Sequence, residues 1–403
     1  MSEVLKTIFH RLVASLDIDT KRYLYSSFKP SNRLLGLAGP RGAGKTTLML
    51  QYIKEKLDLR EVFYVSADNI YFSNNTLFDF IREQYETESI KLFFIDEAHK
   101  YGGWSQELKN VYDSFPDVTV VFSGSSSMDL VKGSYDLSRR GIMHKLHGMS
   151  FREYLNFSTG SNLPPVDLDT LITDRAQLSA ELGALPSLKG YFQEYLKTGY
   201  YPFIFESKDL YFEKLGNIIE KTIYEDIASY YRLKTANLHI FKHILHYLCT
   251  IPPGEINANN LAKNLSLDGK TVMHYLNILQ ETGLVRLLFI DKKGSPLIRR
   301  PAKVFMDNPS LLHGITTTLG HNVNKGTLRE LFFITMLQNS GEKVFYSKDV
   351  GDYLCREIVF EIGGQHKKKK QIRNSKGQAL LVKDDQLQAT SSSIPLWLFG
   401  FLY

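Results

Sequence analysis

The chain has 403 residues, of which 43% are hydrophobic and 23% are charged. This composition is that of a globular protein long enough for two or three domains, and it excludes a disordered or fibrous chain. Two cysteines far apart in the sequence exclude a disulfide framework, and no apolar stretch reaches the length of a membrane span. We therefore expect a cytoplasmic protein without a membrane partner.

The positive charge is concentrated near the end of the chain. The formal net charge is +6, but residues 284–403 carry +8 and the preceding residues carry −2. Affinity for a polyanion such as DNA is therefore expected in the C-terminal third, although a basic surface that only confers solubility would have the same composition.

Residues 1–32 are predicted to be helical, with charged and apolar residues mixed. The first stretch that indicates a function follows them. The run Gly39-Pro-Arg-Gly-Ala-Gly-Lys-Thr46 fits the Walker A pattern GxxxxGK[ST] at every fixed position. An apolar strand, 34–38, precedes it, and a helix, 47–53, follows it, which is the order that a phosphate-binding loop requires. Glycines let the backbone N–H groups face phosphate oxygens, while Lys45 reaches the β- and γ-phosphates and Thr46 binds Mg²⁺. The residues expected to bind ATP are Gly39, Pro40, Arg41, Gly42, Ala43, Gly44, Lys45, Thr46 and Thr47.

A second motif supports the first. Strand 62–66 is followed along the chain by the apolar strand 90–95, which ends in Asp96-Glu97. This is a Walker B pattern, in which Asp96 holds Mg²⁺ together with Thr46 and Glu97 polarises the attacking water.

The next strand, 118–122, ends in the polar run Ser123-Gly-Ser-Ser-Ser127. A polar residue at this strand end could sense the γ-phosphate, or the run could be a plain Ser/Gly turn. Two arginines, Arg139 and Arg140, come after it; they could supply an arginine finger to a neighbouring subunit or pair with surface carboxylates. Alternating strands and helices predict a doubly wound parallel sheet over residues 1–150, in the α/β class.

The runs GPRGAGKTTLMLQYIK, FFIDEAHKYGGWSQELK, VVFSGSSSMDL, DLSRR and LHGMSFREYL resemble prokaryotic AAA-type ATPases that carry a C-terminal restriction-endonuclease-like domain. The resemblance implies that Lys45, Thr46, Asp96 and Glu97 bind and hydrolyse Mg-ATP. It also implies that Ser125 lies at the sensor strand and that Arg140 or Arg139 faces nucleotide.

Residues 96–99 also spell the DEAH box of one helicase group. Those helicases need a second motor domain, and no second motor pattern follows residue 150. We interpret the match as incidental.

Residues 151–235 are predicted to form a helical lid, with the step Gly199-Tyr-Tyr-Pro202 inside it. Residues 236–306 are predicted to form a winged helix. A helix is expected at 260–265, and a second helix follows it, before strands 284–290 and 303–306. The second helix carries an apolar stripe of Val272, Tyr275, Leu276 and Leu279. The basic wing between these strands suits DNA, but winged helices also bind proteins.

Residues 307–403 resemble the PD-(D/E)xK nuclease fold, with a helix at 328–337 followed by strands and a buried final strand at 394–403. By position Glu330, Asp352 and Glu361 match the acidic residues of that fold, but Gly363 stands where its lysine belongs. Lys348 or Lys367 could replace this lysine only if the fold brought one of them there. We therefore expect an inactive nuclease-like domain.

The sequence thus predicts an AAA-type ATPase that hydrolyses Mg-ATP to switch contacts with a DNA or protein partner, with homo-oligomerisation possible. The alternatives are a nucleotide-gated adaptor with little turnover and an ATP-regulated nuclease.

Overall fold

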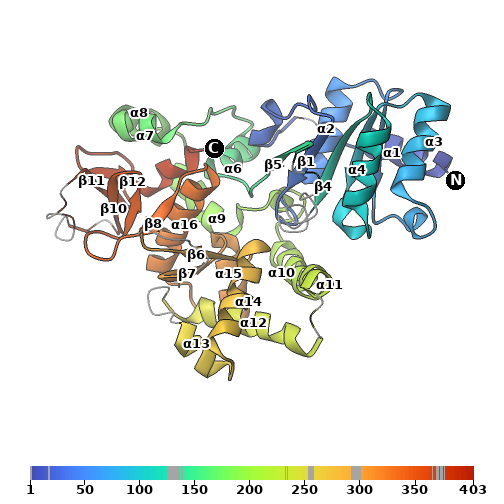
Figure 1. Cartoon of the computed structure of the whole chain (residues 1–403). Helices are drawn as coiled ribbons and strands as arrows, with labels where there is room; N and C mark the ends of the chain where they lie inside the picture. The colour runs from blue at the N-terminus through green and yellow to red at the C-terminus, as the bar shows by residue number, and fades with distance from the viewer. Residues whose placement is uncertain are drawn as a thin grey trace. The chain divides into compact units, whose positions relative to one another are not determined.

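The computed structural model describes residues 2–16, 19–124, 137, 139–231, 233, 235–252, 258–291, 301–364, 366–368, 372, 375 and 377–403. The chain forms two compact units, Met1–Gly148 and Met149–Tyr403 (Figure 1). Each unit is described by itself below.

Unit 1 is built on a five-stranded sheet in the order β2-β3-β4-β1-β5. Every strand pair in it is parallel, and β1 lies between β4 and β5. This result confirms the predicted α/β fold with a parallel sheet. The strands are β1 (Leu34–Ala38), β2 (Val62–Ser66), β3 (Leu92–Asp96), β4 (Thr119–Gly124) and β5 (Gly141–Lys145).

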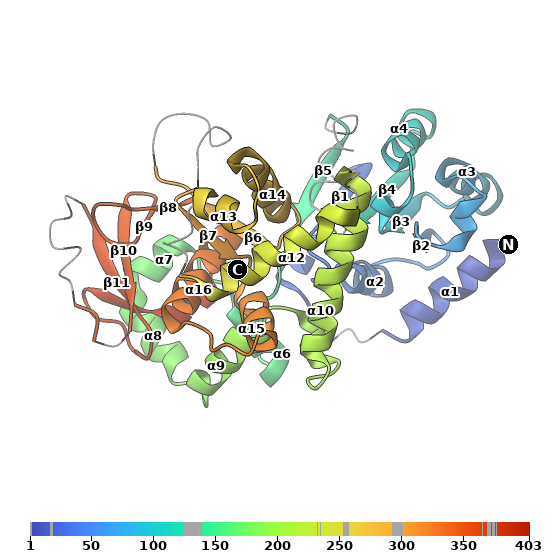
Figure 2. The same cartoon turned by 90° about the horizontal axis from the view of Figure 1, so that it is seen from below.

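Both faces of this sheet are covered by helices, because side chains of alternate strand residues enter two different apolar clusters. Leu35 and Leu37 pack with helices α1 (Ser2–Ala14) and α2 (Lys45–Lys56), whereas Leu34 lies in the cluster of α3 (Leu77–Glu88) and α4 (Trp104–Ser114). The two pairs of helices are seen on opposite sides of the strands in Figure 2. The strands are apolar on both faces, as expected of a parallel sheet that is buried on both sides.

Several predicted boundaries in unit 1 differ from the structure, and the one at the end of β4 bears on the site. Strand β4 continues to Gly124, so Ser123 and Gly124 belong to the strand and not to a following turn. The register explains the extension, because Ser123 and Gly124 pair with Leu37 and Ala38 of β1. Ser125 lies outside the described residues.

Unit 2 begins with helices that pack against its C-terminal residues. The guanidinium of Arg175 donates to the carbonyls of Thr390 (3.1 Å) and Ser391 (2.7 Å), and the Ser179 hydroxyl accepts from the backbone N–H of Ala389 (2.8 Å). The helices predicted as a lid are therefore part of the same unit as the C-terminal sheet, and the predicted domain boundaries within this unit stay predictions. These helices are α6 (Phe151–Thr159), α7 (Leu168–Thr173), α8 (Arg175–Gly183), α9 (Leu188–Thr198), α10 (Tyr211–Lys221) and α11 (Ala228–Tyr231), with η4 (Pro202–Phe205) and the π-helix η5 (Thr222–Ile227) between them.

The middle of unit 2 contains three helices and a two-stranded antiparallel sheet. Helix α14 starts after Asp268, whose side chain accepts hydrogen bonds from the backbone N–H groups of Lys270 and Thr271. Residues 292–300 of the predicted basic wing lie outside the described residues, so the winged-helix assignment stays a prediction. The elements are α12 (Thr235–Thr250), α13 (Ala258–Asn264), α14 (Gly269–Glu281), β6 (Val285–Leu288) and β7 (Lys303–Met306).

The end of unit 2 carries a second five-stranded sheet in the order β12-β11-β10-β9-β8, in which the first three strands are parallel and the last two pair antiparallel. The predicted final strand was largely wrong. Only β12 (Ser393–Pro395) is extended, and the 3₁₀ helix η9 (Leu396–Phe401) follows Pro395, which has no backbone N–H to donate to a strand. The other elements are α15 (Pro309–Thr318), α16 (Lys325–Asn339), β8 (Val344–Tyr346), β9 (Tyr353–Cys355), β10 (Ile358–Gly363) and β11 (Ala379–Lys383).

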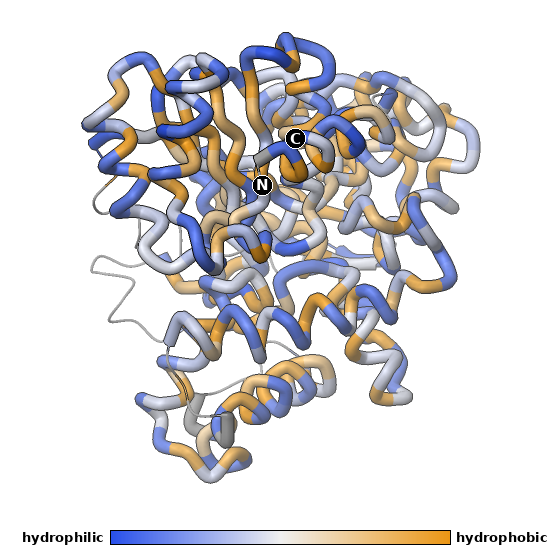
Figure 3. The backbone as a smooth tube through the Cα atoms, turned by 90° about the vertical axis from the view of Figure 1, so that its right-hand side faces the viewer, coloured by the Kyte–Doolittle hydropathy of each residue, from blue (hydrophilic) through white to orange (hydrophobic). Residues whose placement is uncertain are grey.

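In Figure 3 many helices change between orange and blue along their length, as amphipathic surface helices do. In the described parts of the chain, no helix combines the length and the apolarity that crossing a membrane requires.

Candidate functional site

The phosphate-binding loop connects β1 to α2 at the carboxyl end of the sheet. Gly44 caps the helix with a φ of 90°, a conformation that favours glycine. A Cβ at Gly39 would lie 2.2 Å from the carbonyl oxygen of Leu146, so the chain after β5 leaves no room for a side chain there. Among the residues that the structure describes, no side chain caps the start of α2. The loop therefore has the tight turn and the uncapped helix N-terminus that suit an anion.

The side chain of Lys45 is buried and lies over this loop. Its Nζ donates to the carbonyls of Gly39 (2.9 Å) and Pro40 (3.1 Å). These contacts hold an ammonium group at the start of α2, where the helix dipole also favours negative charge on a ligand.

Asp96, at the end of β3, collects hydrogen bonds from four donors. Its Oδ2 accepts from the Thr46 hydroxyl (2.5 Å) and the Tyr64 hydroxyl (2.9 Å), and its Oδ1 accepts from the Ser123 hydroxyl and from the backbone N–H of Glu97 (3.1 Å). An ionised carboxylate only accepts hydrogen bonds, so this set suits a carboxylate. The fold thus brings the Walker A threonine and the Walker B aspartate into direct contact.

Glu97 directly follows Asp96 in a left-handed conformation, with a φ of 51°. This conformation costs about 1–3 kcal/mol for a residue with a side chain and is common at functional sites. Its Oε2 is buried and lies 3.6 Å from Nε2 of His99 without making a hydrogen bond among the described residues. A buried carboxylate oxygen of this kind can accept a proton or a hydrogen bond from a water molecule.

These residues fit Mg²⁺ with a nucleotide. A hydroxyl and a carboxylate 2.5 Å apart provide two oxygen ligands, and Mg²⁺ in nucleotide sites takes its remaining ligands from water and phosphate. Thr47 is exposed beside Thr46 on the first turn of α2.

Sequence reasoning named Ser123 only as part of a polar run, without its contact to Asp96, and missed Tyr64 and Arg22. Ser123 and Tyr64 donate to Asp96, and Arg22 donates from one guanidinium nitrogen to the Ala43 carbonyl and from another to the His147 carbonyl (2.7 Å). Ser123 could have been found from its place directly after the apolar run of β4. Arg22 has no sequence signal, because it belongs to no motif.

Arg140 pairs with a surface carboxylate. Its Nε lies 3.1 Å from Oδ1 of Asp113 on α4, and its guanidinium lies 5.7 Å from the ring of Tyr112. Pairing with a surface carboxylate was one of the two roles expected from the sequence; an arginine finger was the other. The arginine-finger roles of Arg139 and Arg140 and the sensor role of Ser125 stay predictions.

A second cluster of charged residues lies in unit 2 and contains Glu330, Asp352, Glu361, Lys303 and Lys367; we call it the carboxylate–lysine cluster. Nζ of Lys303 lies 2.7 Å from Oε2 of Glu330 and 3.1 Å from the Tyr353 hydroxyl. Nζ of Lys367 forms an ion pair with Oε1 of the fully buried Glu361. Sequence reasoning named the three acidic residues and missed Lys303.

The side chain of Lys367 fills the space beside Gly363. A Cβ at Gly363 would lie 2.5 Å from Cγ of Lys367. Gly363 thus leaves room for a lysine side chain that arrives from four residues further along the chain. Lys367 thus reaches the space where a replacement for the missing lysine would have to lie.

Burial raises the pKa of both Asp352 and Glu361. The backbone N–H of Ile362 opposes this rise at Asp352, and the Lys367 ammonium opposes it at Glu361. Among the described residues, no group of three or more His, Cys, Asp or Glu side chains is arranged to hold a metal ion.

Comparison with known families assigns unit 1 to a class. Residues 31–155 match the family model described as an AAA domain. Residues 31–155 are therefore similar to AAA domains, and the match spans the Walker A and Walker B residues. Residues 189–321 match a second model, described as a domain of unknown function (DUF8612). No curated protein matches the chain.

A comparison with solved structures found partial similarities at low sequence identity. The Walker-type ATPase PABY2304 of Pyrococcus abyssi is 12% identical with a TM-score of 0.40, and the match covers 71% of this chain and 91% of that one. A structure on katanin self-assembly is 20% identical over 41% of this chain and 58% of that one, with a TM-score of 0.25. PCH-2 of C. elegans is 17% identical over 44% and 48%, with a TM-score of 0.24.

Proposed function

We propose that unit 1 binds Mg-ATP and hydrolyses it. The observation that carries this proposal is the contact of Thr46 with Asp96, since it joins the two motifs at the end of the sheet where the phosphate loop lies. The match of residues 31–155 to the AAA domain supports it.

Each residue of the site has a role in this proposal. Lys45 and the N-terminus of α2 bind the phosphates. Thr46 and Asp96 would hold Mg²⁺, which would neutralise charge on the phosphate oxygens. Tyr64 and Ser123 fix the carboxylate of Asp96. Burial and the neighbouring Asp96 raise the pKa of Tyr64, so this phenol stays a donor. Glu97 accepts a hydrogen bond from the attacking water and orients it.

A direct test of nucleotide binding uses Lys45→Ala. We expect this variant to lose binding of a fluorescent ATP analogue measured by anisotropy, while Lys54→Ala, further along α2, keeps it. Equal affinity of Lys45→Ala and the unchanged chain would contradict the assignment of the loop.

We further infer that ATP turnover switches contacts with a DNA or protein partner. Only the ATP state has the γ-phosphate, so a partner that is sensitive to the phosphate loop can distinguish ATP from ADP. The basic C-terminal third supports DNA as the partner. An adaptor that holds ATP with little turnover is the alternative within the same site.

An ATP-regulated nuclease is the second candidate, and the position of Lys367 beside Gly363 is the observation that favours it. Two observations oppose it. The Lys367 ammonium is already paired with Glu361, and the described carboxylates are not arranged around a metal position. We therefore propose that unit 2 does not cut nucleic acid.

The nuclease candidate is tested with supercoiled plasmid and single-stranded DNA in Mg²⁺ or Mn²⁺, with and without ATP. We expect both DNA substrates to remain intact. Cleavage that Glu361→Gln and Lys367→Met both abolish would establish the nuclease instead.

A further inference from the structure

An apolar pocket lies within unit 2 between helices α10, α12 and α15. Its wall is made by Phe212, Leu215, Ile219, Leu245 and Ile315, and its volume is about 160 Å³. An engineered apolar cavity of about 150 Å³ is large enough to bind benzene. The pocket therefore has room for one small aromatic molecule.

A glycine keeps this pocket open. Gly216 lies inside helix α10 and lines the pocket, and a Cβ built on it would meet no atom within 4 Å. Glycine inside a helix costs about 1 kcal/mol relative to alanine, and here no packing contact requires it. Gly314 on α15 differs, because a Cβ there would lie 2.9 Å from Cδ2 of Leu215. The absence of a side chain at Gly216 thus leaves this part of the pocket open.

The polar residues of the pocket favour a neutral ligand. Lys242 and Glu220 form an ion pair, and the Lys242 ammonium also lies 5.1 Å from the centre of the Tyr224 ring. The two charges compensate each other and offer little to an ionic ligand. His246 and Thr318 add polar groups to the lining, but the Thr318 hydroxyl already donates to the Gly314 carbonyl (2.8 Å). The imidazole of His246 is mainly neutral near pH 7, because partial burial and then the nearby His243 and Lys242 lower its pKa.

The pocket belongs to the part of the chain that matches the domain of unknown function. Helices α10, α12 and α15 all lie within residues 189–321. We propose that this pocket binds a small neutral aromatic molecule of phenol to indole size. The proposal does not depend on ATP hydrolysis by unit 1.

Saturation-transfer NMR on the full chain, with indole as the probe, tests this proposal. We expect magnetisation transfer from the unchanged protein to indole. Gly216→Met places a side chain in the pocket, so transfer should be lost while thermal stability is retained or increased. Gly190→Met is the matched control, since Gly190 is an exposed glycine of helix α9 with no atom within 4 Å of its Cβ position.

Either of two results with indole would overturn the proposal. One is no transfer to indole in the unchanged chain, and the other is equal transfer in the chain and in Gly216→Met. If Gly216→Met does not fold, Gly216→Ala replaces it, and a reduced transfer relative to Gly190→Ala is then required. Benzoate serves as a charged comparison and should show weaker transfer than indole, because the compensated rim does not favour an anion; stronger transfer to benzoate would contradict the choice of a neutral ligand.

Discussion

At the scale of single residues, Asp96 organises the nucleotide site. Its four hydrogen-bond donors come from the phosphate-loop helix, from two neighbouring strands and from the backbone that follows it. Because each donor fixes one direction of the carboxylate, the loss of one should disturb how the aspartate holds Mg²⁺.

Ser123→Ala should therefore slow ATP hydrolysis while nucleotide binding persists. Loss of such a supporting partner lowers metal affinity or activity by about 10- to 100-fold. The steady-state rate of phosphate release and the affinity for a fluorescent ATP analogue measure the two effects. Ser66→Ala is the control, since this serine also ends a strand of the sheet but its hydroxyl donates to Asp68. Equal rates of phosphate release for both variants would contradict a role of Ser123 in the site.

His313 on α15 predicts a pH dependence of stability. Burial, and then the nearby Lys197, lowers the pKa of His313 from 6.5 to about 4. Below pH 6.5 the unfolded chain takes up a proton at this residue, whereas the folded chain does so only near pH 4. The free energy of unfolding should therefore fall as the pH decreases from 6.5 to 4.

Urea unfolding at pH 7 and pH 5 measures this effect. His313→Gln should lose less stability between the two pH values than the unchanged chain does. His321→Gln, at an exposed histidine after α15, should behave like the unchanged chain. A larger loss of stability in His313→Gln than in the unchanged chain would contradict the predicted direction of the pH dependence.

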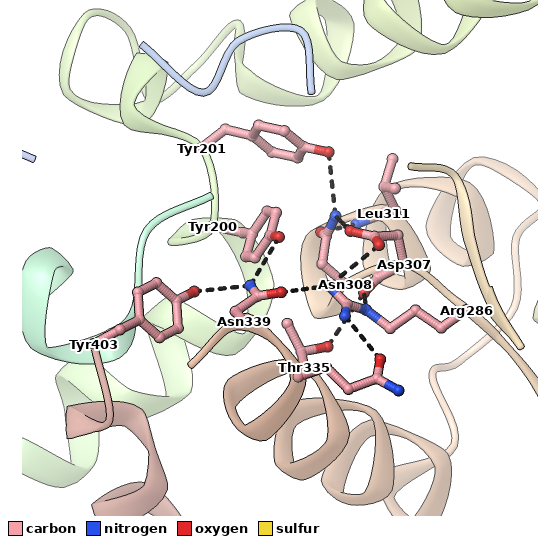
Figure 4. A network of polar contacts seen from close by, with 10 residues as sticks. Tyr200, Tyr201, Arg286, Asp307, Asn308, Leu311, Thr335, Asn339 and Tyr403 are labelled. Carbon is pink, nitrogen blue, oxygen red and sulfur yellow. Dashed lines mark hydrogen bonds and ion pairs between the residues drawn. The ribbon is translucent and has the colours of Figure 1, made fainter. Parts of the chain in front are cut away.

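At the scale of elements, a buried polar network connects β6, α15, α16 and the step 200–201 (Figure 4). Arg286 donates to Oδ1 of Asn339 (2.9 Å) and forms an ion pair with Asp307 (3.2 Å). Asn339 in turn donates to the hydroxyls of Tyr200 (3.2 Å) and Tyr403 (2.9 Å). The network therefore joins segments that are far apart in sequence.

Arg286→Ala should destabilise unit 2 by about 3–5 kcal/mol, because it leaves a largely buried carboxylate without its partner. The free energy of unfolding from urea titration gives the value. Arg140→Ala breaks an exposed ion pair with Asp113 and should cost only about 0–1 kcal/mol. Similar losses in the two variants would show that the network contributes little.

The sequence predicted those parts of the fold and site that depend on local pattern. Walker A and B residues were recognisable because their order along the chain follows from a strand, a loop and a helix. Ser123, Tyr64 and Lys303 were not recognised, since their roles depend on strand register and on side chains that arrive from distant segments. The prediction of a final strand at 394–403 was largely wrong, because a continuous apolar run does not distinguish a strand from a buried 3₁₀ helix.

At the scale of the whole molecule, the proposed partner is tested by salt dependence. If the basic C-terminal third binds duplex DNA, the logarithm of the binding constant should fall with the logarithm of salt concentration by about 0.9 per phosphate contact. Replacing Lys292, Lys293, Arg299 and Arg300 by alanine should flatten this slope. No retention of duplex or single-stranded DNA at about 50 mM salt would favour a protein partner.

The most direct test of the central proposal, ATP hydrolysis in unit 1, is phosphate release by the full chain compared with Glu97→Gln, at ATP concentrations where both bind nucleotide. Glutamine preserves the shape of the side chain but cannot act as the carboxylate that orients water. We predict that the unchanged chain releases phosphate in a Mg²⁺-dependent reaction and that Glu97→Gln binds ATP without turnover. Equal phosphate release by the two proteins would contradict the role of Glu97, and the absence of release from the unchanged chain would contradict the ATPase itself.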